Sequence, residues 1–172
     1  MEIVKILGCD PSLRATGLAL VEYNTDTKEY KVSKCRTLSN PQKYTGKDAI
    51  LNMLDMIREV AEEYEDADTI IVESPPVLFN KNWSQGTVAS IAHVSGGAAA
   101  LLGLEKTFLF RPNEWNKNRK KDVTHKNTIA VLGDPDTWGY AKIIKSERKL
   151  EHVLDAASMA IFWIKHQYID EE

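Results

Sequence analysis

The chain has 172 residues, of which 43% are hydrophobic and 27% are charged, with a formal net charge of -3. These proportions predict one globular domain, residues 1–172, with a core of its own. They exclude collagen-like, disulfide-rich and fully disordered classes.

No run approaches the roughly 18 apolar residues that cross a membrane, and the charged start is not a signal peptide. The two cysteines provide neither a disulfide framework nor paired zinc spacing. We therefore expect a cytoplasmic protein without a membrane partner.

Positive charge is concentrated in one part of the chain. Residues 106–149 contain 11 Lys and Arg residues against five Asp and Glu residues. Nucleic-acid binding relies on such cations, so an acidic protein can still present a DNA-binding face. A mixed, lysine-rich solvent surface is the alternative interpretation.

The first half of the chain predicts a strand unit followed by a helix. Residues 3–9 form an apolar run typical of a buried central strand, whose carboxyl end presents Asp10. Two β-prone segments, residues 16–23 and 29–36, flank a turn, which favours three antiparallel strands in a row. Apolar residues then recur at helical spacing across residues 50–64.

The second half predicts alternating strands and helices. A buried strand delivers Glu73 and is ended by prolines, and a loop continues to about residue 83. The elements expected after it are a small-residue helix at 85–104, a strand at 107–110, a basic connection at 111–121, and helices at 124–132 and 146–167. This order predicts an α/β fold, a five-stranded mixed sheet of three antiparallel strands plus parallel strands, flanked by helices.

Four residues form a candidate catalytic and metal-binding set. Asp10 and Glu73 each end an apolar strand, while His152 and Asp155 are three apart and share one face of the last helix. Hard oxygen ligands of this kind suit Mg²⁺ or Mn²⁺, and two ions about 4 Å apart can promote phosphodiester hydrolysis. A turn-forming aspartate, a solvated strand end and surface decoration of the helix are the alternatives.

Several motifs, in order, resemble those of RuvC-type Holliday-junction resolvases of the RNase H-like superfamily. Residues 7–17 (LGCDPSLRATG) resemble the opening motif, and residues 70–73 (IIVE) the second acidic strand. The small-residue helix and the basic connection follow, and residues 152–157 (HVLDAA) resemble the motif on the last helix.

The resemblance implies an RNase H-like fold and a homodimer that cuts opposed strands of a four-way junction. It implies that Asp10, Glu73 and Asp155 bind the metal, with His152 a fourth ligand or a proton-transfer group. It also places Lys117 and Lys126 near lysines that face DNA in the family, with plain solvated lysines as the alternative. The further candidates for DNA contact are Lys81, Lys120 and Lys121.

The sequence departs from the family pattern in two places. Ser12 replaces the usual glycine after Asp-Pro, and the loop after Glu73 is about two residues longer, with two unusual prolines. That loop carries an aromatic wedge in the family. Phe79 is the first candidate for it and Trp83 the second, with a core aromatic as the alternative.

Other functions remain open at this stage. A nuclease of the same superfamily acting on flaps, branches or RNA-DNA hybrids fits the same residues. A non-catalytic junction-binding protein is a second alternative. A third is an actin-like or Hsp70-like ATPase, because residues 10–17 also resemble the phosphate loop of those proteins. Those folds, however, need two such domains.

Overall fold

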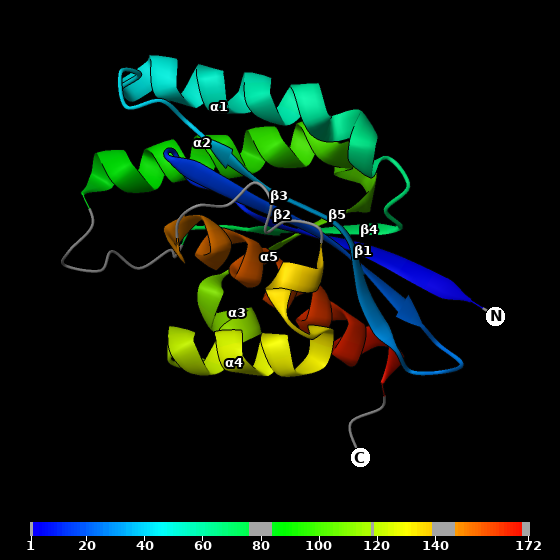
Figure 1. Cartoon of the computed structure of the whole chain (residues 1–172). Helices are drawn as coiled ribbons and strands as arrows, with labels where there is room; N and C mark the ends of the chain where they lie inside the picture. Colours follow the sequence, from blue (N-terminus) through cyan, green and yellow to red (C-terminus); the bar gives the residue numbers. More distant parts are fainter. Residues whose placement is uncertain (1, 76–83, 118, 139–146, 170–172) are drawn as a thin grey trace.

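The structure is a computed structural model that describes residues 2–75, 84–117, 119–138 and 147–169, with the backbone alone at 147–149. Figure 1 shows the elements in space. In chain order they are β1 (Ile3–Asp10), β2 (Ala15–Asn24), β3 (Tyr30–Ser39), α1 (Gly46–Val60), β4 (Thr69–Glu73), α2 (Gln85–Gly103), β5 (Thr107–Phe110), α3 (Pro112–Asn116), α4 (Lys121–Leu132) and α5 (Glu147–Tyr168). Short 3-10 turns follow α1, α2 and α4.

The sheet has five strands in the order β3-β2-β1-β4-β5. Strands β1, β2 and β3 pair antiparallel, whereas β4 is parallel to β1 and β5 is parallel to β4. The predicted five-stranded mixed sheet is therefore confirmed. Because Cys9 pairs with Val72, the carboxyl ends of β1 and β4 lie side by side, and each ends in a carboxylate.

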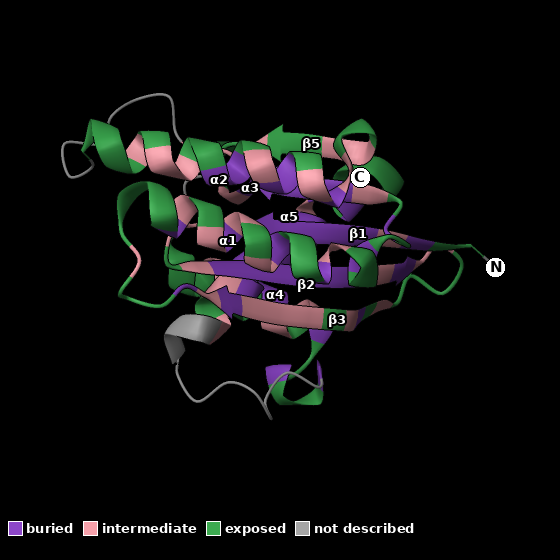
Figure 2. Cartoon of the chain, turned by 90° about the horizontal axis from the view of Figure 1, so that it is seen from above, coloured by how far each residue is buried: buried purple, intermediate pink, exposed green. Residues whose placement is uncertain are grey.

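Helices cover both faces of the sheet. Helices α1 and α2 lie on one face, and α3, α4 and α5 lie on the other (Figure 1). Alternate residues of β1 enter opposite cores, because successive strand side chains point to opposite faces: Ile6 packs toward α5, and Leu7 packs toward α1 and α2. Figure 2 shows β1 and β2 buried along most of their length beneath the partly exposed α1 and α2.

Two glycines let α5 lie directly on β1 and β2. A Cβ on Gly8 would lie 1.8 Å from the carbonyl oxygen of Ala156, and one on Gly17 would lie 2.1 Å from the carbonyl oxygen of His152. No larger residue fits at either position without moving the helix. Since Gly17 pairs with Asp10 across the β1–β2 ladder, this close approach brings α5 to the end of β1 that carries the carboxylate.

The predicted basic connection at 111–121 is wrong in part, because it contains a short helix and α4 begins at its end. Pro112 is favoured in the first turn of α3, where a missing backbone N–H costs nothing. The backbone N–H of Arg111 donates to Glu114 Oε2 at 2.6 Å, and the backbone N–H of Glu114 donates to the Arg111 carbonyl oxygen at 3.0 Å, so both groups have a partner at the start of α3. The sequence shows these signals, but a five-residue helix has too few residues for a periodic pattern.

The expectation that no segment approaches membrane-spanning length is wrong for one helix. Residues Gln85–Lys106 are long and apolar enough by length and composition, with a mean hydropathy of 1.5 over the most apolar window. The core helix of a soluble protein meets the same criterion. Here α2 packs against α1 and β4, and it contributes Val94, Ala98 and Leu102 to the core.

Candidate active site

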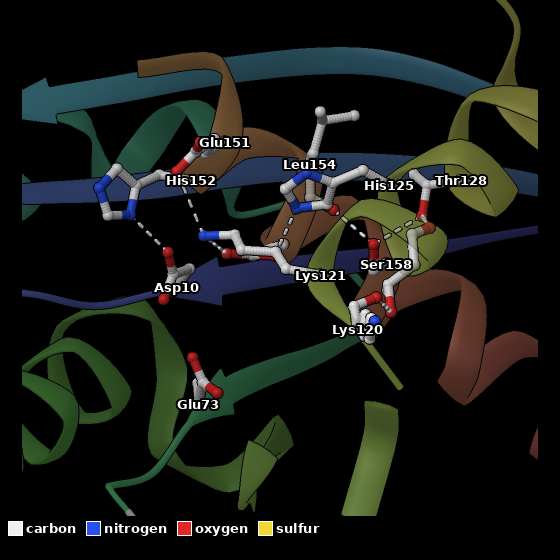
Figure 3. Close-up of polar contacts among 12 residues, drawn as sticks. Asp10, Glu73, Lys120, Lys121, His125, Thr128, Glu151, His152, Leu154 and Ser158 are labelled. Carbon is white, nitrogen blue, oxygen red and sulfur yellow. Dashed lines mark hydrogen bonds and ion pairs between the residues drawn. The ribbon is translucent and has the colours of Figure 1, made fainter. Parts of the chain in front are cut away.

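Asp10 is the last residue of β1 and is 8% exposed. His152, on α5, donates a hydrogen bond from Nδ1 to Asp10 Oδ2 at 2.6 Å (Figure 3). This hydrogen bond raises the pKa of His152 above its ordinary value, against the opposing effect of burial. Asp10 and His152, two of the four predicted site residues, are therefore direct hydrogen-bond partners.

Glu73 ends β4, next to Asp10. Burial raises the pKa of Glu73 to about 9, and the charge of Asp10, a hydrogen bond with Asp10 and the charge of Asp155 add to the increase. The indole Nε1 of Trp115, on α3, donates to Glu73 Oε1 at 3.3 Å, which favours the ionised form. The charges of Asp10 and Asp155 both act on Glu73, so Glu73 keeps its proton at neutral pH while no cation is bound.

Asp155, one helical turn after His152 on α5, is also 8% exposed. Its two oxygens have different partners: His125 Nε2 lies 2.7 Å from Oδ1, and Lys121 Nζ lies 2.8 Å from Oδ2. The Lys121 ammonium lies 3.4 Å from Glu151 Oε2 as well (Figure 3). Burial lowers the pKa of Lys121, but the hydrogen bond and charge of Asp155 outweigh this effect and raise it overall.

The predicted DNA-contacting lysines fall in different places. Lys121 lies among the carboxylates, Lys117 lines a groove, and Lys120 and Lys126 are exposed on or beside α4. Lys117 has a left-handed backbone conformation with φ of 51°, which is uncommon for a residue other than glycine. Three predicted residues, Phe79, Lys81 and Trp83, lie outside the described part of the chain.

The groove lined by Lys117 lies between α3, α4 and α5 and has a volume of about 720 Å³. Its ionisable lining side chains are all basic: besides Lys117 they are Arg119, Lys165 and His166. Trp115 forms part of the same wall and also contacts Glu73. The basic groove therefore adjoins the acidic site.

Sequence reasoning missed His125 and Trp115. The signal for His125 was present: Lys121, His125 and Thr128 are spaced four and three apart on α4, as are Glu151, Asp155 and Ser158 on α5. Matching spacing of basic and acidic side chains on two helices indicates that their faces can pair. For Trp115 the sequence offered no comparable signal.

The chemistry of the donors fits a hard divalent cation. Carboxylate oxygens are the ligands that Mg²⁺ and Mn²⁺ prefer, and the pKa of Glu73 is raised first by burial and then by the negative charges of Asp10 and Asp155. Within the described residues, however, no three His, Cys, Asp or Glu side chains are grouped closely enough to hold a metal ion as they stand. Asp10 and Asp155 are instead engaged by His152, His125 and Lys121.

The arrangement of strands and helices matches solved structures closely enough to define the fold. Thermus thermophilus RuvC, in complex with a Holliday junction substrate, superposes with a TM-score of 0.67 at 13% identity, covering 96% of this chain and 97% of that chain. The fold is RNase H-like.

Two further structures share this RNase H-like fold. The yeast mitochondrial Holliday junction resolvase has a TM-score of 0.62 at 14% identity, covering 96% of this chain and 82% of that chain. The fowlpox virus resolvase with Holliday junction DNA has a TM-score of 0.54 at 11% identity, covering 95% and 98%. No protein-family model and no curated protein sequence matches this chain.

Proposed function

We propose that residues 1–172 form one nuclease domain, which resolves Holliday junctions or other branched DNA by metal-dependent phosphodiester hydrolysis. One observation carries this proposal: Asp10 and Glu73 end the neighbouring strands β1 and β4 of an RNase H-like sheet, and the charge of Asp155, on α5, also acts on Glu73. Structures that match nearly the whole chain are resolvases, two of them bound to junction DNA, which supports the junction as substrate.

Asp10, Glu73 and Asp155 are the residues that would hold Mg²⁺, with Mn²⁺ able to substitute, and His152 is a fourth donor beside them. When bound, one or two such cations would activate water and stabilise the departing 3′-oxygen. A cation also lowers the pKa of a coordinated carboxyl group, so Glu73 would be ionised in the loaded site.

His152 and Lys121 have distinct tasks in this proposal. Nδ1 of His152 is held by Asp10, which leaves Nε2, on the opposite side of the ring, to exchange a proton with water or the leaving oxygen. Lys121 is half exposed, and its ammonium lies beside the carboxylates, where it can pair with the phosphate that approaches them.

The basic groove between α3, α4 and α5 supports DNA as the partner. Lys117, Arg119 and Lys165 carry positive charge along it, and no acidic side chain is among its described lining residues. Such a surface binds phosphates independently of sequence and adds to affinity in a salt-dependent way. The groove meets the acidic site at Trp115, so one DNA strand can contact both.

A homodimer is part of the proposal, because two equivalent sites suit the pseudo-symmetric arms of a four-way junction. One surface of α2 supports it. Ala89, Ala92, Gly96 and Ala100 recur at helical spacing and are all exposed. Small side chains on this face, with His93 beside them, allow close packing against the same face of a second copy.

The test is cleavage of four labelled substrates, namely an immobile four-way junction, a flap, a linear duplex and an RNA-DNA hybrid, each with and without Mg²⁺ or Mn²⁺. We expect paired symmetric nicks confined to the junction. The matched variants are Asp10→Asn and Glu73→Gln, which should abolish cleavage and preserve junction binding, because they remove charge and leave shape unchanged.

Each alternative has its own outcome. Cleavage mainly of flaps or hybrids would favour the related nuclease functions, and metal-independent binding without nicks would favour a junction-binding protein. Retained cleavage in either carboxylate variant would contradict the assignment of the site, and ATP turnover would favour the ATPase alternative.

A further inference from the structure

Helices α4 and α5 are joined by polar contacts at three successive levels. Lys121 faces Glu151 and Asp155, His125 faces Asp155, and Thr128 Oγ1 lies 2.6 Å from Ser158 Oγ (Figure 3). Thr128 and Ser158 are 3% and 6% exposed, so the lowest level is a buried hydrogen bond. The contacts become more exposed toward the acidic site, where Lys121 is 50% exposed.

The two partners of Asp155 differ in how firmly they are fixed. The His125 side chain is 14% exposed, and its ring is held at 2.7 Å from Oδ1. A carboxylate oxygen accepts, so Nε2 donates. Lys121 reaches Oδ2 from solvent on a long flexible chain, and it also contacts Glu151. One oxygen is therefore anchored within the protein, and the other is held by a side chain that can withdraw.

We propose that His125 is a positioning residue, which anchors Oδ1 of Asp155 so that Oδ2 is presented to a divalent cation in place of the Lys121 ammonium. The inference rests on the proposed nuclease function and adds a residue that neither the strand ends nor the α5 motif identifies. The terminal torsion of aspartate is broad, so anchoring one oxygen is what fixes the direction of the other. Partners that orient a metal ligand commonly change metal affinity by about 10- to 100-fold.

The experiment measures binding of Mn²⁺ alone to the full chain by calorimetry, with no DNA present. His125→Ala should weaken Mn²⁺ binding by about 10-fold or more. His125→Gln should restore most of the affinity, because its amide nitrogen takes nearly the place of Nε2. His125→Asn reaches only as far as Nδ1 and should behave like the alanine variant.

Thr128→Val is the matched control. It breaks the buried hydrogen bond between the same two helices without removing a contact of Asp155. Its thermal stability should fall while its Mn²⁺ affinity stays at the wild-type value. If the control loses affinity as much as His125→Ala, general loosening of α4 is the explanation, and the positioning assignment is overturned.

Lys121→Met tests the same arrangement without altering His125, and because the Lys121 side chain is 50% exposed we expect the variant to fold. Removing the competing ammonium should tighten Mn²⁺ binding by about threefold or more, since one nearby positive charge is lost. Unchanged or weaker Mn²⁺ binding would overturn the proposal that a divalent cation takes the place of the Lys121 ammonium at Oδ2 of Asp155.

The proposed nuclease function and the positioning role of His125 can fail separately. If the wild-type chain binds Mn²⁺ and nicks junctions but His125→Ala has the same Kd, the nuclease stands and the positioning role is overturned. A wild-type chain that binds no Mn²⁺ would overturn both.

Discussion

Gly17→Ala tests whether the close approach of α5 to β2 builds the site. The new Cβ would lie 2.1 Å from the carbonyl oxygen of His152 and 2.3 Å from its carbonyl carbon. Real Cβ atoms essentially never come closer than 3.0 Å to another heavy atom, and here the obstructing atoms are backbone. Helix α5 must therefore move by at least about 0.9 Å.

A displacement of this size affects both stability and activity. Overpacking against a backbone that cannot yield should cost about 3 kcal/mol. For a chain of this length, that corresponds to a decrease in Tm of about 6–12 °C. The 2.6 Å hydrogen bond between His152 and Asp10 would also lengthen beyond the usual limit of about 3.2 Å, and a 1 Å misplacement can cost about 100-fold in rate.

Thermal unfolding by circular dichroism and junction cleavage below the lowered Tm measure the two effects. Gly86→Ala is the control, since among the residues that the structure describes its Cβ would meet only the Ser84 hydroxyl, at an ordinary 3.9 Å. It should unfold and cleave like the wild type. A Gly17→Ala protein with wild-type Tm and wild-type cleavage would refute the reasoning, because the position of α5 would then not depend on the absence of a Cβ at residue 17.

Three further predictions concern the site and the assembly. Because burial raises the pKa of Glu73 from 4.5 to about 9, the folded metal-free protein keeps a proton that the unfolded chain loses. Its free energy of unfolding should therefore fall as the pH rises between these values, by at most about 1.4 kcal/mol per pH unit. Urea unfolding at a series of pH values, in the presence of a chelator, measures this dependence, and the free energy of unfolding of Glu73→Gln should change less with pH. His152→Ala should reduce single-turnover junction cleavage by about 100-fold without abolishing it, because the carboxylates remain; a wild-type rate would exclude a ligand or proton-transfer role. If the chain forms the proposed dimer, Gly96→Glu should convert it to a monomer in sedimentation analysis, since a Cβ at this position meets no described residue within 4 Å in one copy and the new side chain would place charge at the packed face; a persisting dimer would rule out this face of α2.

The sequence by itself determined most of the fold, because the signals were local. Apolar runs predicted the strands, helical spacing predicted α1 and α5, and the order of elements predicted a mixed sheet. It also placed Asp10 and Glu73 together, since parallel neighbouring strands end at the same edge of a sheet. The three-residue spacing of His152 and Asp155 was sufficient to put them on one face of α5.

Only the tertiary structure decided how these groups are partnered. His125 reaches Asp155 across 30 residues of sequence, and Trp115 reaches Glu73 across 42. Such contacts depend on how far each helix is rotated about its axis, and the spacing of apolar residues does not fix that rotation closely enough to pair individual side chains. The function of Gly8 and Gly17 was equally hidden, because a missing Cβ has meaning only when the backbone that would strike it is in place.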